Sequence, residues 1–146
     1  MLVGTLCSRP PVTVPTGAPI SDVARLMQER HVGAVVVTET RGAGPRAAGI
    51  ITDRDIVSAQ LARTADLSRL SAAEIMTRNP LVIAEDEPVD GAIAHLRARG
   101  VRRAPVISQQ GAVVGLISVD DLFAHVAREL IDMAETIARQ RRAEHD

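Results

Sequence analysis

Aromatic residues are almost missing from this chain of 146 residues, which has one Phe and neither Trp nor Tyr. Proteins that bind single-stranded nucleic acids stack the bases on aromatic side chains, so this shortage argues against a nucleic-acid partner. The formal net charge of −1 supports the same exclusion, because no strong field attracts polyanions or anionic membranes. Aliphatic side chains must therefore form the core.

Cysteine and long apolar runs are scarce as well. Cys7 is the single cysteine, which excludes an internal disulfide and fits a reducing compartment. No apolar run approaches the roughly 20 residues that cross a bilayer, and the first residues lack the basic segment and apolar core of a secretory signal. We therefore expect a cytoplasmic protein with no membrane partner.

The motifs of enzymes and metal sites are missing too. The four histidines are scattered, with no second ligand at the spacing of a zinc site. There is no Walker loop, no nucleophile elbow and no Ser-His-Asp order. The sequence thus predicts neither catalysis, nor a resident metal, nor a required cofactor.

What the chain does contain is an internal repeat. Residues 10–37, PPVTVPTGAPISDVARLMQERHVGAVVV, are echoed by residues 79–106, NPLVIAEDEPVDGAIAHLRARGVRRAPV, with matching positions 69 apart. The interval falls to 66 between Asp55 and Asp121, because a Gly-rich turn of the first copy is three residues longer. Length changes in such turns cost little, so the repeat is maintained across them.

Each copy predicts the same order of elements, β-α-β-β-α. The expected strands are residues 12–14, 34–38 and 48–51 in the first copy and 81–83, 104–108 and 113–117 in the second. The expected helix faces are Ile20, Val23, Ala24 and Met27 in the first copy and Val89, Ala92, Ile93 and Leu96 in the second. Gly100 is expected to end the second of these helices. Two copies predict an α/β (α+β) fold of two small helix-covered sheets that pack as one body.

Both copies end on a Gly, two apolar residues, a hydroxyl residue and, three residues later, an acid. These motifs are residues 49–55, GIITDRD, and 115–121, GLISVDD. With their lead-in segments they resemble the cystathionine-β-synthase (CBS) domain, and the tandem resembles a CBS pair, or Bateman module. Further support for this resemblance comes from residues 31–37, 74–77 and 100–106.

The resemblance covers roughly residues 5–130 and implies two CBS repeats related by a pseudo-two-fold axis. It places repeat 1 at 5–64, a linker at 65–74, repeat 2 at 75–130, and a C-terminal helix extension at 131–146. In that extension and the helix before it, apolar residues follow at spacings of 4, 4, 3 and 4, close to a heptad seam: Leu122, Val126, Leu130, Met133 and Ile137. Because CBS pairs commonly form two-fold dimers, we expect a homodimer; the alternative is a helix lying back on its own domain.

The resemblance also implies a role for the motif acids, which in the family bind the two hydroxyls of a ribose. An ionised carboxylate has two acceptor oxygens and can receive both donors of a cis-diol. A helix that starts beside it directs free N–H groups at a phosphate. The alternative is that an acid simply caps the closing helix. We favour the ligand role for Asp55 and Asp121, and the capping role for Asp53 and Asp120.

Two clefts between the repeats follow from the resemblance. The main one is expected to combine Thr52, Arg54 and Asp55 with Leu81, Val101, Arg102 and Arg103. Its three guanidinium groups suit phosphates, although Arg102 and Arg103 could instead serve a solvated turn or a dimer salt bridge. The second is expected to combine Val12, Val32 and Gly33 with Ser118, Asp120 and Asp121. There Asp120 would repel phosphate and no Arg at 33 or 34 offsets it, so we expect this cleft to bind weakly, to stay empty or to prefer an uncharged nucleoside.

The function expected from the sequence is therefore a non-enzymatic regulatory sensor for an adenine nucleotide, AMP, ADP or ATP, with Mg²⁺ as an optional companion of ATP. It would act on a protein partner that the sequence does not identify. The alternative is a structural or protein-interaction CBS module without a physiological nucleotide ligand.

Overall fold

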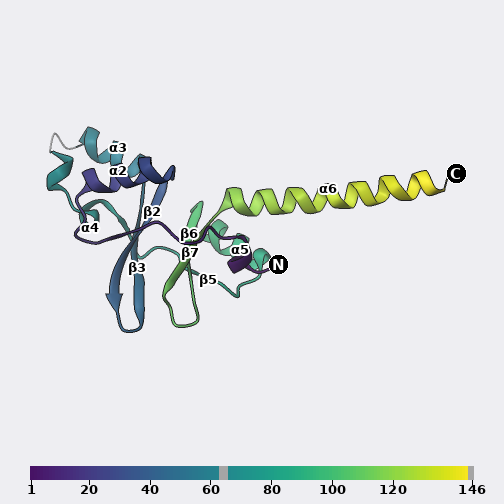
Figure 1. The fold of residues 1–146 in the computed structure, drawn as a ribbon, viewed down its shortest axis with the longest axis horizontal. Helices are drawn as coiled ribbons and strands as arrows, with labels where there is room; N and C mark the ends of the chain where they lie inside the picture. The colour runs from purple at the N-terminus through teal and green to yellow at the C-terminus, as the bar shows by residue number, and fades with distance from the viewer. Residues whose placement is uncertain (63–65, 145–146) are drawn as a thin grey trace.

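The computed structural model describes residues 1–62 and 66–144, and its β-strands form two separate sheets (Figure 1). The predicted boundaries at 64, 65 and 146 lie outside the described residues. The first sheet has the order β1-β2-β3-β4 and the second the order β5-β6-β7. The strands are β1 Thr13–Pro15, β2 Ala34–Arg41, β3 Gly44–Thr52, β4 Thr77–Arg78, β5 Ile83–Ala84, β6 Arg103–Ile107 and β7 Val113–Ser118.

Helices precede, separate and follow these strands in the predicted β-α-β-β-α order. They are α1 Val3–Leu6, α2 Ile20–Arg30, α3 Asp53–Ala62, α4 Ala72–Ile75, α5 Val89–Arg99 and α6 Val119–Ala143, with a 3₁₀ turn η1 at Leu67–Arg69. No helix among the described residues is long and apolar enough to cross a membrane.

The two repeats match even in local irregularities. In each, a short strand pairs in parallel with the next strand, which then forms an antiparallel hairpin. The register shifts between Val37 and Thr38 in the first hairpin and between Val106 and Ile107, the equivalent place, in the second. Helices α2 and α5 both end on a left-handed residue, His31 and Gly100, which confirms the predicted stop at Gly100.

Each sheet packs against its own apolar cluster. The buried face of α2, with Ile20, Val23 and Met27, contributes to the first cluster as predicted. In α5, Ala92 and Leu96 are buried in the second cluster, whereas Ile93 is 42% exposed, so its expected core position was wrong. Ile93 lies instead on the side of α5 that faces α6, where it lines a groove.

The N-terminal segment, which precedes repeat 1, packs into the core of repeat 2, and the connection that precedes repeat 2 packs into the core of repeat 1. Val3 and Cys7 are buried in the second cluster, and Gly4 N–H donates to the Glu85 carbonyl. Arg9 reaches Glu85 at 2.8 Å, and this hydrogen bond raises the pKa of the Arg9 guanidinium above its ordinary value. In the segment 65–74, assigned to a linker from the sequence, Leu70 and Ala72 are buried in the first cluster. The two cores are thus held together by exchanged segments.

These crossings explain the glycine that opens both end motifs. A Cβ on Gly49 would lie 2.6 Å from Met76 Sδ and 2.8 Å from the Thr77 carbonyl oxygen. A Cβ on Gly115 would lie 2.6 Å from Cys7 Sγ and 3.0 Å from the Ser8 carbonyl oxygen. Only a residue without a side chain lets the crossing segment approach each strand so closely.

Helix α6 leaves the body of the molecule and projects far beyond both sheets (Figure 1). Its buried residues are Leu122 and His125, both close to its start. The rest of this helix, about three quarters of its length, extends past the core that it helps to close.

Candidate functional site

The hydroxyl and acid of the first end motif form a reciprocal cap at the start of α3. Thr52 N–H donates to Asp55 Oδ2 at 2.8 Å, and Asp55 N–H donates to Thr52 Oγ1 at 3.2 Å. This pairing at i and i+3 satisfies two backbone donors at the helix end and fixes the direction in which Asp55 points. The capping alternative that the sequence left open for Asp55 is therefore realised in the structure.

The second motif repeats this arrangement at the start of α6. Ser118 N–H and Ser118 Oγ donate to Asp121 Oδ2 at 2.9 and 2.7 Å, and Asp121 N–H donates back to Ser118 Oγ at 3.2 Å. In both caps Oδ2 makes the hydrogen bonds. Within residues 1–62 and 66–144 the other oxygen, Oδ1, makes none, so each carboxylate can cap its helix and still accept from a ligand.

The corner between helix and strand in each repeat is tied to the start of a closing helix. Asp53 N–H donates to the Gly33 carbonyl at 3.0 Å in the first repeat, and Val119 N–H donates to the Arg102 carbonyl at 2.8 Å in the second. These equivalent bonds bring the corner of each repeat next to its own motif. Arg102 is therefore held where the first repeat has Gly33.

One pocket contains all seven residues of the predicted main cleft. It has a volume of about 440 Å³ and combines the end motif of repeat 1 with the lead-in and corner of repeat 2. The seven are Thr52, Arg54, Asp55, Leu81, Val101, Arg102 and Arg103. Sequence reasoning missed Ile50, Asp53, Thr77 and Pro80, which also line it; the match of Pro80 with Pro11 in the repeat was a signal that could have found one of them.

Three arginines and two aspartates make this first cleft cationic on balance. Arg102 Nη2 lies 3.3 Å from Asp120 Oδ1, and both side chains are more than 70% exposed. An ion pair in such contact with water stabilises little, about 0–1 kcal/mol, so a phosphate can compete for this guanidinium. The N-terminus of α3 opens into the same cleft and adds a favourable dipole for an anion.

A second, smaller pocket of about 240 Å³ contains five of the six residues predicted for the second cleft: Val12, Val32, Gly33, Ser118 and Asp121. Asp120 does not line it, because its carboxylate turns toward Arg102. Arg103 lines this pocket as well as the first one, so a cation is present where the sequence predicted none.

The two clefts adjoin at Gly33. A Cβ built there would lie 3.5 Å from Asp53 Oδ2 and 3.9 Å from Arg103 Nη2, two side chains of the first cleft. Arg103 therefore lies on the wall that both pockets share. Among the described residues, no group of three or more His, Cys, Asp or Glu side chains is placed to hold a metal ion.

Comparison with known families agrees with this geometry. The sequence profile described as "CBS domain" matches residues 3–62 and again residues 72–128. The chain belongs to the CBS domain family. Its two repeats form a CBS pair, and the resemblance deduced from the end motifs is confirmed.

The curated relatives that the chain matches are longer proteins. The chain is 33% identical over 114 residues to an uncharacterized 17.7 kDa protein of Acidianus ambivalens, covering 78% of this chain and 63% of that one. It is 30% identical over 121 residues to L-aspartate semialdehyde sulfurtransferase of Methanocaldococcus jannaschii, covering 83% of this chain and 22% of the enzyme. The chain therefore spans less than two thirds of each relative.

Solved structures show the same pair with adenine compounds. The CBS domain pair of protein MJ0100, in complex with 5′-methylthioadenosine and S-adenosyl-L-methionine, has a TM-score of 0.76 and 28% identity, covering 88% of this chain and 98% of that one. The CBS domain protein PAE2072 from Pyrobaculum aerophilum, complexed with AMP, has a TM-score of 0.73 and 30% identity, covering 83% and 89%. Related CBS pairs thus bind nucleotides and related nucleosides.

Proposed function

We propose that the CBS pair is a regulatory module, without catalytic activity of its own, that binds an adenine nucleotide in the first cleft. The observation that carries the proposal is the convergence of Thr52, Asp55 and three arginines on one pocket of about 440 Å³. That volume suits a small-molecule ligand. Related pairs that bind AMP or S-adenosyl-L-methionine support adenine as the base.

Each part of such a ligand has a matching group in the cleft. Asp55 Oδ1 is the acceptor for the ribose hydroxyls while Oδ2 continues to cap α3. Arg54, Arg102 and Arg103 supply charge-assisted donors for one to three phosphates, which accommodates AMP, ADP or ATP. Mg²⁺ enters only with ATP, since its phosphates would have to complete a ligand set that Asp53 and Asp55 leave short.

The second cleft is proposed to bind more weakly or to prefer an uncharged nucleoside. It is little more than half as large, and Arg103 is its one lining cation among the described residues. Asp120, which the sequence assigned to this cleft, does not line it and pairs with Arg102 instead, so the proposal rests on the size of the pocket and the single cation among its described lining residues.

Regulation requires that ligand binding change an assembly. We propose further that the chain forms a cytoplasmic homodimer. Nucleotide binding would change the geometry of this dimer or the angle between its repeats, and a protein partner would recognise the change. A ligand produces such a response only by binding two states with different affinity.

Thermal melting of the purified chain tests the ligand. AMP, ATP, NAD and S-adenosyl-L-methionine are added separately, with ribose 5-phosphate as the control that lacks the base. A ligand at a hundred times its Kd stabilises the native state by about 2.7 kcal/mol, which corresponds to a rise in Tm of roughly 5–10 °C for a chain of this length.

A rise with at least one adenine compound and none with ribose 5-phosphate would support the proposal. No rise with any compound, at concentrations far above those in cells, would favour the interaction module without a nucleotide ligand. The caps give that alternative a structural basis, because they account for Asp55 and Asp121 without any ligand.

A further inference from the structure

The outer part of α6 carries large apolar side chains that its own repeat does not cover. Leu130, Met133 and Ile137 are 61%, 62% and 52% exposed, on a segment that projects away from the body (Figure 1). An isolated helical segment of this length is marginal in water, and helices gain most of their stability from packing an apolar face. A monomeric protein rarely exposes such a continuous row, which indicates that a partner surface covers it.

The exposed row follows a strict heptad spacing. The sequence placed Leu122 in the seam, but this residue is 2% exposed and buried in its own repeat. Phe123, at 73% exposure, takes its place. The row then reads Val119, Phe123, Val126, Leu130, Met133 and Ile137, at spacings of 4, 3, 4, 3 and 4, which is the a/d pattern of a helix that packs along another helix.

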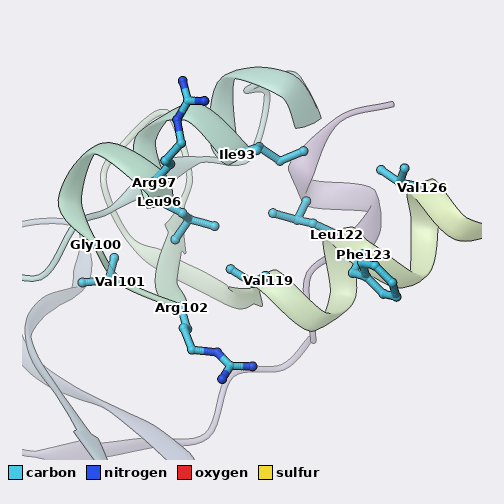
Figure 2. A pocket seen from close by; sticks show the side chains of 10 residues that line it. All are labelled: Ile93, Leu96, Arg97, Gly100, Val101, Arg102, Val119, Leu122, Phe123 and Val126. Carbon is cyan, nitrogen blue, oxygen red and sulfur yellow. The ribbon is translucent and has the colours of Figure 1, made fainter.

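The start of this row continues into an apolar groove. A pocket of about 410 Å³ lies between α5 and the first turns of α6, with Val119, Phe123 and Val126 on one wall and Ile93 and Leu96 on the other (Figure 2). Figure 2 shows the side chains of Ile93 and Leu122 directed into the space between the two helices. A helix lying along α6 would therefore also occupy the groove.

Charge along α6 favours one orientation of such a helix. Acidic residues outnumber basic ones in its first two thirds, with acids at positions 120, 121, 129, 132 and 135 against Arg128, and arginines gather at positions 139, 141 and 142 near its end. Two parallel copies would bring the arginine-rich ends together. Two antiparallel copies set the basic end of one near the acidic first turn of the other, with Arg139 within one helical turn of the level of Asp120, and they also oppose the helix dipoles.

We propose that two copies of this chain pair through α6 in antiparallel orientation, with the distal half of each helix seated in the groove between α5 and α6 of the other. This inference rests on the homodimer of the proposed function and is independent of the nucleotide site.

The register follows from pairing all six members of the heptad row. Antiparallel helices set each a position against a d position of the partner. Phe123 then packs on Met133 of the partner subunit, Val126 on Leu130 of the partner subunit, and Val119 on Ile137 of the partner subunit. Six apolar layers form, without a polar residue in any of them. The groove receives Met133 and Ile137 of the partner subunit, which suit its apolar lining.

Small residues let the helices approach closely on one flank of the row. Ala127 and Ala134 stand there one heptad apart. On the other flank, Glu129 meets its own counterpart near the two-fold axis. Its carboxylate lies 3.2 Å from His125 Nε2 on the same helix, which draws it away from the axis.

Engineered disulfides test orientation and register together. In a Cys7→Ala background, we compare Phe123→Cys, Met133→Cys and the double variant, oxidise each, and detect covalent dimers by intact mass. In the proposed pair, position 123 lies about 15 Å along the axis from position 123 of the other copy, at 1.5 Å per residue, and the two positions 133 are equally far apart. Both distances are too long for a disulfide. Each single variant should therefore stay uncrosslinked, and the double variant should form a covalent dimer.

A matched control uses the same levels of the helix on its outer face. The double variant Ala124→Cys with Asp132→Cys should give no covalent dimer. Circular dichroism of every variant shows that the fold is retained, and light scattering of the parent chain should give the mass of a dimer.

Covalent dimers from either single variant would show parallel helices and overturn the inference. A dimer by light scattering whose Phe123→Cys/Met133→Cys variant does not crosslink would overturn it too, while leaving the homodimer of the proposed function intact. A monomer would overturn both the inference and that homodimer, and would leave the nucleotide proposal to its own melting test.

Discussion

The two clefts of this CBS pair share a backbone plan and differ in a few side chains. Beside each cleft, the closing helix begins with the same reciprocal cap, Thr52 with Asp55 in α3 and Ser118 with Asp121 in α6. The corner that lines the first cleft carries Arg102 and Arg103, whereas the equivalent corner of the second cleft carries Gly33 and Ala34. The repeat therefore preserves the helix starts, and the corners decide the charge.

The closing helices add to this difference. Arg54 follows the first motif strand and lines the first cleft, while its equivalent, Asp120, pairs with Arg102 on the outside of the second. Three positions per repeat are thus enough to turn one duplicated scaffold into a cationic cleft and a nearly neutral one. If the phosphate of the ligand selects the first cleft, then exchanging or neutralising these few groups should change the difference in affinity between the two clefts in a graded way.

The largest effect is expected from Asp55→Asn. Asparagine keeps an acceptor oxygen for the cap but loses the charge that receives the ribose hydroxyls, and hydrogen bonds to charged groups contribute about 1.5–3 kcal/mol. Calorimetric titration with AMP should show a Kd raised roughly 10- to 100-fold. The matched control, Asp121→Asn, should change it less than about threefold. A larger loss in the Asp121 variant would reverse the ranking of the two clefts.

A smaller effect is expected from Arg103→Ala. This side chain lines both clefts and lies on their shared wall, so its charge acts on phosphate in either one. We expect about fivefold weaker binding of AMP, equivalent to about 1 kcal/mol, with binding of adenosine unchanged. The loss should shrink as salt is raised, because exposed charges are screened. Arg41→Ala removes an exposed arginine of β2 as a control. Equal losses for AMP and adenosine would show that Arg103 supports the fold rather than the phosphate.

Much of this comparison could be predicted from the sequence, because the features concerned are local or repeated. A hydroxyl residue and an acid three positions apart after a strand can meet in a cap whatever surrounds them. The matching positions 69 apart indicated which corner faces which motif once the CBS pair was recognised. All seven residues of the main cleft accordingly meet in one pocket.

Other features depend on the directions of side chains and helices, which the pattern of residues along the sequence does not specify. Asp120 follows the motif strand immediately, but its position on the first turn of α6 turns it toward Arg102 instead of into the second cleft. Arg103 is long enough to reach a wall common to both pockets. Leu122 and Phe123 are adjacent apolar residues, and which one the core covers depends on the angle at which α6 leaves the body.

The smallest effect in the comparison is expected from Asp120→Ser. The variant removes the carboxylate 3.3 Å from Arg102, and because both side chains are well exposed the lost pair contributes at most about 1 kcal/mol. Arg102 then becomes fully available to phosphate, so AMP should bind the first cleft about two- to threefold more tightly, as measured by calorimetry. Ser118 and Asp121 keep their cap in this variant, so Tm without ligand should change little. If the second cleft gained affinity for AMP and the first did not, Asp120 would act as a repulsive charge on its own cleft, as first expected from the sequence, and not as a competitor for Arg102.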